Sequence, residues 1–337
     1  MAEEKKRKVV GVEDPKIETK RLTIFLIAVF GIAWIAELGV IKPMYQSGDV
    51  DTVKEAVNMI SSMMFAPAFA SLIARVMTKE GLLHSGFQFN FAKHKFCFLF
   101  GWFGTTALTF LGAVLYFIIF HDNYDASMTN FVQAAIDNGS ELDAVNIIAN
   151  FKTTLLINVF SAPVLDVINS FGEEWGWRGY LLPKLYRKFG TTKAILISGL
   201  ISGLWYAPLV SLGYYYGTGY AGYPFTGILA MCVFGMVTGC IYSFISLRSG
   251  SIFPAIFAHS AVNVMMSQAA YFTKDGGNFF VGPAPTGIVA GIPFIIAAVV
   301  FMLYLKKHPV VSSNEQEAKE ASVSYTHLRA HETLANL

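Results

Sequence analysis

The sequence is poor in charged residues: Asp, Glu, Lys and Arg account for only 14% of its 337 residues. About 25% is usual in soluble proteins. Hydrophobic residues make up 54% of the chain, and the mean hydropathy is +0.49. This balance excludes an ordinary soluble domain and predicts a protein that crosses a membrane several times.

Cysteine is scarce as well, and there is no large surplus of positive charge. Cys97, Cys232 and Cys240 lie within apolar segments and form no CxxC spacing, so they indicate neither a zinc site nor a disulfide framework. The net charge is only +2, and the basic residues form short clusters at segment ends. We therefore expect no nucleic-acid partner, no metal and no cofactor.

The two ends of the chain are polar. Residues 1–21 lack the apolar core of a cleavable signal peptide and are predicted to form a basic cytosolic tail. Residues 307–337 form a polar C-terminal tail, and their stretch from Val323 resembles translated sequencing-adaptor sequence, so we leave it out of the fold prediction. His327 and His331 lie in that stretch and are not interpreted as metal ligands.

Between the tails, eight apolar runs are long enough to approach or span a hydrocarbon core of about 30 Å as helices. The connections between them alternate between basic and less basic, and the positive-inside rule then places both termini in the cytosol. The prediction is an all-α polytopic membrane domain over 22–306, in a bacterial plasma membrane. The expected spans are 22–41, 56–78, 95–120, 153–182, 193–212, 225–247, 251–270 and 285–305.

The third connection, residues 121–152, is long and acidic. Asn138, Gly139 and Ser140 interrupt two weakly amphipathic pieces within it. We expect a pair of short interfacial helices there.

Residues 171–180, Phe-Gly-Glu-Glu-Trp-Gly-Trp-Arg-Gly-Tyr, place three charges in the fourth expected span. A charge at bilayer depth costs about 2.5 to 3.5 kcal/mol or more, and such groups usually face a cavity with a function. Glu174 and Arg178 are four residues apart and can pair on one helix face. A structural ion pair would explain those two residues, but it leaves Glu173 unexplained.

Two other expected spans carry polar residues at a similar depth. His259 is the only histidine in any predicted span, and Asn263 follows it by one helical turn. Counted from the cytosolic end of its own span, Tyr206 lies about one helical turn deeper than Glu173 and His259 do in their spans. We expect these side chains and the glutamates to line one polar cavity that opens toward the cytosol.

The residue types in this cavity favour hydrolysis by an activated water. One histidine with two glutamates and an asparagine is a poor set of ligands for catalytic zinc. A carboxylate desolvated by the bilayer can act as a general base, which we assign to Glu173. His259 and Asn263 can donate hydrogen bonds to a developing oxyanion.

Two motifs resemble those of the CPBP family of CAAX proteases and bacteriocin-processing or immunity proteins, also called Abi. Residues 172–183 resemble its EExxxR motif and residues 249–263 its HxxxN motif, within a core of about 150–270. The resemblance implies a metal-independent glutamate endopeptidase within the membrane, acting on a lipidated, hydrophobic or leader-type peptide. It also implies that Glu173 activates water, Glu174 and Arg178 shape the site, and His259 with Asn263 stabilises the oxyanion.

The third motif of that family, FxxxH, is altered in this chain. Residues 202–208 read Ser-Gly-Leu-Trp-Tyr-Ala-Pro, with Tyr206 where the family has histidine. A phenol, with a pKa of about 10, orients a water but is a poor proton shuttle at neutral pH. A non-catalytic relative that binds hydrophobic peptides therefore stays open, as does a transporter, although the motif spacing speaks against transport.

Overall fold

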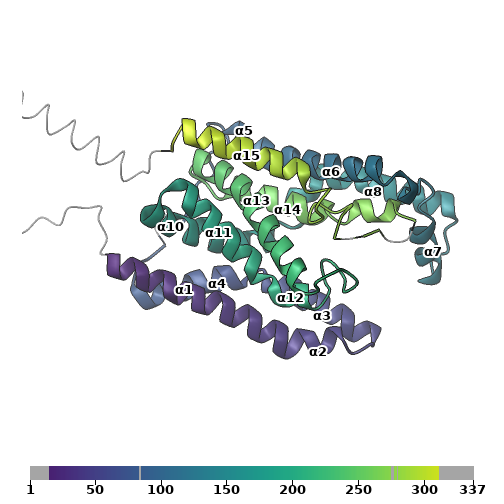
Figure 1. Cartoon of the computed structure of the whole chain (residues 1–337), viewed down its shortest axis with the longest axis horizontal. Helices are drawn as coiled ribbons and strands as arrows, with labels where there is room; N and C mark the ends of the chain where they lie inside the picture. The colour runs from purple at the N-terminus through teal and green to yellow at the C-terminus, as the bar shows by residue number, and fades with distance from the viewer. Residues whose placement is uncertain (1–14, 83–84, 275–276, 279, 311–337) are drawn as a thin grey trace, which may run out of the picture.

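The computed structural model describes residues 15–82, 85–274, 277–278 and 280–310, and within these ranges it contains helices and no β-strand (Figure 1). Most of both predicted tails, with His327 and His331, lies outside the described residues. The helices are α1 Pro15–Ala36, η1 Glu37–Ile41, α2 Lys42–Tyr45, α3 Val50–Met63, α4 Ala66–Thr78, α5 Lys95–Leu99, η2 Phe100–Gly104, α6 Thr105–Ile119, η3 His121–Asn123, α7 Thr129–Asp137, α8 Ala144–Leu165, α9 Val167–Gly176, η4 Trp177–Leu181, α10 Leu182–Phe189, α11 Thr191–Trp205, α12 Ala207–Ser211, α13 Phe225–Ser249, α14 Phe253–Met265, η5 Gln268–Phe272 and α15 Ile292–Lys307.

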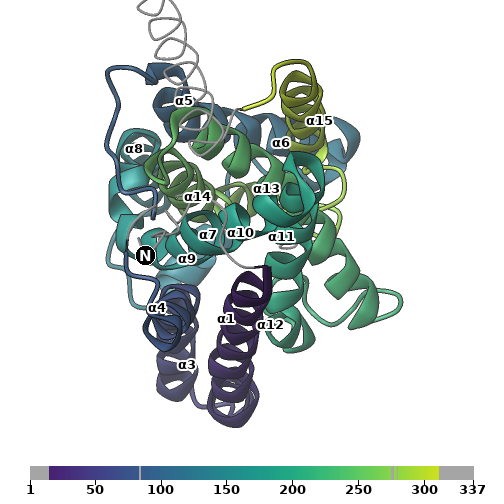
Figure 2. The same cartoon turned by 90° about the vertical axis from the view of Figure 1, so that its left-hand side faces the viewer.

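The helices form three layers. The N-terminal helices α1 to α4 lie along one side, α5, α6 and α15 lie along the other, and α9 to α14 lie between them (Figures 1 and 2). Helix α1 continues without a break through the π-helical segment η1 into α2. The central layer therefore has protein on both sides, which allows it to hold polar side chains away from lipid.

Small residues bring the two long helices of the central layer into close contact. A Cβ at Gly203 of α11 would lie 2.6 Å from the Cα of Cys232 on α13. A Cβ at Gly235 would lie 2.7 Å from the carbonyl oxygen of Gly199. Glycine is thus required for this backbone approach, which is typical of helix packing in membranes.

The helices support a polytopic membrane protein. Four segments of the described chain are long and apolar enough to cross a membrane by themselves, or five if the pair α3 and α4, bent by 42°, counts as one span. Helices α11, α14 and α15 have only 15, 13 and 16 residues, so eight full-length spans are not reached by length and composition. The four segments are Lys16–Tyr45, Lys95–Ile119, Ala144–Ala162 and Phe225–Ser249.

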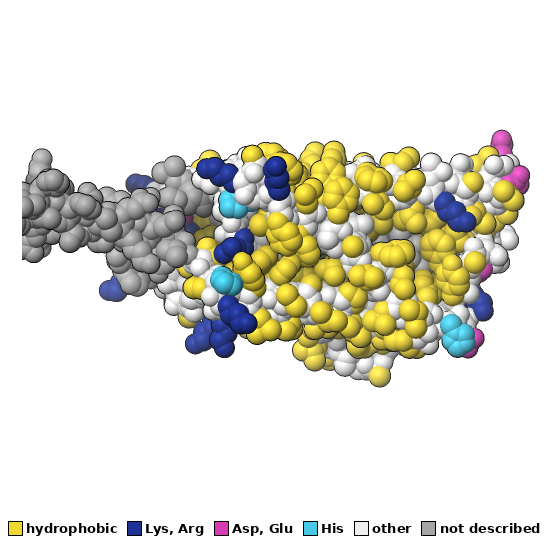
Figure 3. Space-filling view, turned by 90° about the horizontal axis from the view of Figure 1, so that it is seen from above, with side chains coloured by type: hydrophobic (Ala, Val, Ile, Leu, Met, Phe, Trp, Pro, Cys, Tyr) yellow, Lys and Arg dark blue, Asp and Glu magenta, His cyan; other side chains and the backbone are white. Residues whose placement is uncertain are grey.

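Charge is distributed as a membrane protein requires. A band of hydrophobic side chains covers the middle of the surface in Figure 3, with most of the visible Lys and Arg gathered at one end and the visible Asp and Glu, beside a few Lys or Arg, at the other. Both ends of the described chain lie at the basic end, because α10 contacts each of them. Arg187 binds Glu18 at the start of α1 at 3.0 Å, and the Tyr186 hydroxyl donates to the Val310 carbonyl at 2.9 Å.

The long third connection differs from the prediction. It contains the 3₁₀ turn η3 and one short α-helix, α7, which ends before Asn138 and Gly139. The second expected piece is instead the first part of α8, because Asp143 caps that helix by accepting a hydrogen bond from the Asn146 N–H at 2.8 Å.

The fourth expected span is broken at its centre. Helix α8 ends at Leu165 and α9 begins at Val167, so Asp166 and Glu173 do not share one continuous helix. Asp166 leaves the helical region with φ −113° and ψ 13°. Pro163, three residues earlier, supplies no backbone N–H, which weakens the helix at this point.

Candidate active site

Helix α9 presents the two glutamates to the interior of the bundle. The exposed fractions of Glu173 and Glu174 are 1% and 0%. The helix packs closely on α4, because a Cβ at Gly176 would lie only 2.3 Å from the Cβ of Pro67. Glycine at this position therefore lets α9 approach α4 and fixes the depth of both carboxylates.

Glu174 is the centre of a buried charged cluster. Its Oε1 accepts a hydrogen bond from Arg178 at 2.9 Å, which is the predicted pair. The same oxygen lies 2.8 Å from Nδ1 of His259. When Nδ1 carries the imidazole proton, it donates a hydrogen bond to Glu174, and the unprotonated Nε2 faces Glu173. The Tyr242 ring packs against both partners of Glu174, 5.2 Å from the Arg178 guanidinium and 5.6 Å from the His259 ring.

Glu173 has a different set of partners. Its Oε2 accepts a hydrogen bond from the Trp177 indole N–H at 3.0 Å, and its Oε1 accepts one from the Tyr206 hydroxyl at 2.6 Å. Nε2 of His259 lies 4.0 Å from Oε1. Glu173 is thus held in position by two neutral donors and faces the free edge of the imidazole.

Tyr206 stands at a break between two helices. Helix α11 ends at Trp205, and α12 begins at Ala207 with Pro208 in its first turn. A proline in the first turn of a helix loses no helical hydrogen bond, so the chain can end one helix and start another here. The indole N–H of Trp34 on α1 donates to the Trp205 carbonyl at 3.0 Å, which ties this break to the N-terminal layer.

Asn263 binds Asp166 at the end of α8. Its amide donates to Asp166 Oδ2 at 2.9 Å, and the same oxygen accepts a hydrogen bond from Ser170 at 2.8 Å. One of the two amide N–H groups of Asn263 is therefore engaged, and the other remains for a group in the cavity. The sequence predicted that Asn263 faces the site, but not its partner.

Two cavities meet at Glu173 and Tyr206. The smaller, of about 60 Å³, is also lined by Arg178, His259 and Asn263. The larger, of about 260 Å³, is also lined by Asn263. The structure thus brings the predicted residues together: five of the six line one cavity, and Glu174 binds two of those five.

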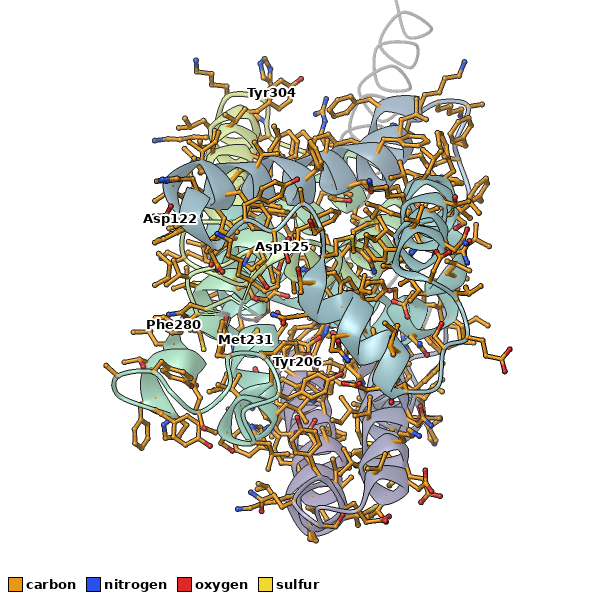
Figure 4. The ribbon with its side chains drawn as sticks, turned by 90° about the vertical axis from the view of Figure 1, so that its right-hand side faces the viewer. Asp122, Asp125, Tyr206, Met231, Phe280 and Tyr304 are labelled. Carbon is orange, nitrogen blue, oxygen red and sulfur yellow. The ribbon has the colours of Figure 1, made fainter. Side chains whose placement is uncertain are left out.

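The larger cavity extends away from the basic end of the molecule. Its lining includes Tyr214 and Tyr215, which belong to the connection between α12 and α13. Helix α13 runs from this connection to Arg248 at the basic end, so the connection lies at the opposite end. In the view from that end, Tyr206 lies inside the bundle, where the N-terminal layer meets the rest (Figure 4). The opening of the cavity toward the cytosol, expected from the sequence, stays a prediction.

Several residues around the site were not predicted from the sequence. No sequence feature marked the aromatic residues Trp177, Tyr215 and Tyr242 as part of the site, because aromatic residues are common throughout the apolar spans. Glu37 could have been recognised from the sequence, since it is the only acidic residue in the expected span 22–41. It is fully buried in η1.

The donor set does not resemble a metal site. Within the described ranges, no three His, Cys, Asp or Glu side chains are grouped so that they could hold a metal ion. The three buried cysteines are free thiols.

The comparisons agree with the motifs. Residues 154–265 match the family described as type II CAAX prenyl endopeptidase Rce1-like, and this range includes all six candidate residues. Over 167 residues the chain is 27% identical to lysostaphin resistance protein A of Staphylococcus haemolyticus (strain JCSC1435). That stretch is 49% of this chain and 43% of the relative, so the match spans less than half of the relative's length. The resemblance to CAAX-type proteases predicted from the sequence is confirmed for this region.

Proposed function

We propose that this chain, whose residues 154–265 match a family of CAAX prenyl endopeptidases, is an intramembrane endopeptidase. One observation carries the proposal: Glu173 is buried, lines two cavities, and directs the same oxygen toward the Tyr206 hydroxyl and His259 Nε2. A buried, oriented carboxylate beside an imidazole suits proton transfer from water.

In the proposed reaction, a water molecule lies between Glu173 Oε1 and His259 Nε2, whose separation of 4.0 Å suits a bridged rather than a direct contact. The water oxygen forms a bond to the carbonyl carbon of the substrate peptide, and Glu173 takes the water proton. The C–N bond then breaks, and the proton passes from Glu173 to the leaving amine. One water molecule is consumed, and the carboxylate returns to its starting state.

The neighbouring groups support the transition state. The second amide N–H of Asn263 is available to the carbonyl oxygen as negative charge develops on it. Arg178 and Glu174 hold His259 in one orientation, because Glu174 Oε1 binds both. These three act as a rigid support for the reacting groups.

Tyr206 moderates the reactivity of Glu173. Its hydroxyl donates to the oxygen that would accept the water proton, so the hydrogen bond stabilises the carboxylate and lowers its strength as a base. This contact also favours the second candidate function, a non-catalytic relative that binds hydrophobic peptides without cleaving them.

The proposed substrates are lipidated, hydrophobic or leader-type peptides in a bacterial plasma membrane, with both termini of the protein in the cytosol. The larger cavity suits apolar side chains, because Ile60, Met64 and Leu209 line it beside the tyrosines. Its position near Glu173 allows a bound chain to approach the carboxylate.

The test compares three purified proteins in liposomes: the parent, Glu173→Gln and the control Glu55→Gln, which alters an exposed glutamate of α3. Each receives fluorogenic farnesylated, transmembrane and leader-type peptides. We expect the parent and the control to cleave at least one class, and Glu173→Gln to lose about 10² to 10⁴-fold in rate. Activity should survive a chelator.

Two results would contradict the proposal. If Glu173→Gln cleaves as fast as the parent, the glutamate mechanism is wrong. If the parent binds a peptide in fluorescence anisotropy but never cleaves it, the non-catalytic function is correct.

A further inference from the structure

Glu37 is a buried carboxyl group with no direct role in the proposed reaction. Its exposed fraction is 0%, and neither carboxylate oxygen has a hydrogen-bond partner among the residues that the structure describes. It begins the π-helical segment η1 within an otherwise regular helix. Such π-helical insertions often occur at functional sites.

A carboxylate in this setting is costly. Moving an ionised carboxylate out of water without a partner costs several kcal/mol, and the group usually becomes neutral instead. Glu173 lies in an equally buried position but accepts two hydrogen bonds that stabilise its charge. Of the two, Glu37 is therefore the better place for a proton.

Glu37 lies close to the site because α1 is anchored there. Trp34, one helical turn before Glu37, donates to the carbonyl of Trp205, the residue next to Tyr206. Segment η1 also packs on α12, which begins directly after Tyr206. Ile41 of η1 belongs to a hydrophobic cluster against which Tyr206 and Tyr215 pack, and both tyrosines line the two cavities together with Glu173.

Other charged groups near η1 have little influence on Glu37. On α2, Lys42 is exposed. On α3, Asp51 and Lys54 form an exposed ion pair at 3.5 Å. Helix α12 carries no titratable residue, and Arg21 on α1 lies sixteen residues away, about 24 Å along the helix.

We infer that Glu37 and Glu173 form a coupled pair of carboxyl groups, in which Glu37 holds a proton while Glu173 is ionised. Glu37 is then a positioning residue for charge: while it is neutral, no second negative charge opposes Glu173. When Glu37 loses its proton to the solvent, its negative charge strengthens Glu173 as a proton acceptor. The role in catalysis rests on the proposed function, but the pair itself does not.

The first test measures the pair without turnover. Infrared spectra of the purified protein, recorded across a pH titration, should show a protonated carboxyl band that disappears in Glu37→Gln and persists in Glu55→Gln. Glu37→Asp, which keeps a carboxyl, should shift the band and so identifies it if Glu37→Gln does not fold. In Glu173→Gln the midpoint of the band should move to lower pH by about one unit, because the neighbouring charge is gone.

The second test uses the rate of peptide cleavage. The pH–rate profile of the parent should rise in two steps, one for each carboxyl, and that of Glu37→Gln in one. The coupled pair would be contradicted by an infrared carboxyl band that is unchanged in both Glu37 variants, or by a titration midpoint of that band that is unchanged in Glu173→Gln. Because the infrared titration needs no activity, its outcome is independent of whether the protein proves to be a protease.

Discussion

The Tyr206 hydroxyl donates a hydrogen bond of 2.6 Å to Oε1 of Glu173. This contact joins the residue that departs from the family motif to the proposed general base. It also occupies the oxygen that faces His259 Nε2. The consequences of this one bond can be measured directly.

Replacing Tyr206 with histidine should raise turnover. An imidazole can accept and return a proton near neutral pH, whereas the phenol only donates to Glu173. We expect kcat to increase about tenfold. Tyr206→Phe is the matched control, since it removes the hydroxyl and adds no proton carrier. Equal or lower turnover in Tyr206→His than in Tyr206→Phe would show that the tyrosine does not limit the rate.

Removing the cation of the buried pair should destabilise the protein. In Arg178→Met, Glu174 stays buried and keeps only its contact with His259, and removing one partner of a buried ion pair costs about 3 to 5 kcal/mol. The measurement is the free energy of unfolding in detergent. Lys54→Met, which breaks an exposed pair with Asp51, is the control and should change little. A similar small change in both variants would contradict the structural importance of the Glu174 cluster.

A methyl group at Gly176 should separate α9 from α4. The added Cβ would lie 2.3 Å from Pro67 Cβ and 2.6 Å from the Pro67 carbonyl oxygen, so one helix must move. We expect Gly176→Ala to lower stability by about 1 to 3 kcal/mol and to displace both glutamates. Gly31→Ala on α1 meets no atom within 4 Å and should be neutral or slightly stabilising. Thermal unfolding measures the stability of both variants, and cleavage assays measure their activity. Equal values for Gly176→Ala and Gly31→Ala would contradict the prediction.

The order of α7 should depend on pH through Asp125. Its carboxylate accepts hydrogen bonds from the backbone N–H groups of Ser127 at 2.8 Å and Thr129 at 2.7 Å, and hydrogen bonding from Thr129 lowers its pKa. A lowered pKa in the folded state means that the stabilisation is present above the ordinary pKa of aspartate. It is lost as the pH falls through the lower, folded value.

Hydrogen exchange of the α7 amides tests this prediction. Exchange, corrected for its intrinsic pH dependence, should increase in acid in the parent, and Asp125→Asn should remove most of this change. Asp122→Asn, at an exposed position in the same connection, is the control. Identical acid responses in the parent and Asp125→Asn would refute the role of this carboxylate.

Some features of the site follow from local sequence spacing. Glu174 and Arg178 pair because residues four apart meet on any α-helix, and the structure keeps this pair even where α9 passes into η4. The membrane character likewise follows from long apolar runs. The lengths of the spans were harder to predict, because the polar break at Asp166 and the proline after Tyr206 stop helices inside apolar sequence.

By itself, the sequence determined an all-α membrane protein, the candidate residues of the site and the ion pair within one helix, since these depend on composition, motif spacing and helical period. Only the tertiary structure decided that Tyr206 binds Glu173, that His259 binds Glu174 and that Asn263 binds Asp166. These contacts join residues 33 to 97 positions apart in the sequence. Their geometry depends on how each helix is rotated and shifted against its neighbours, and the close approach of glycine faces sets that arrangement.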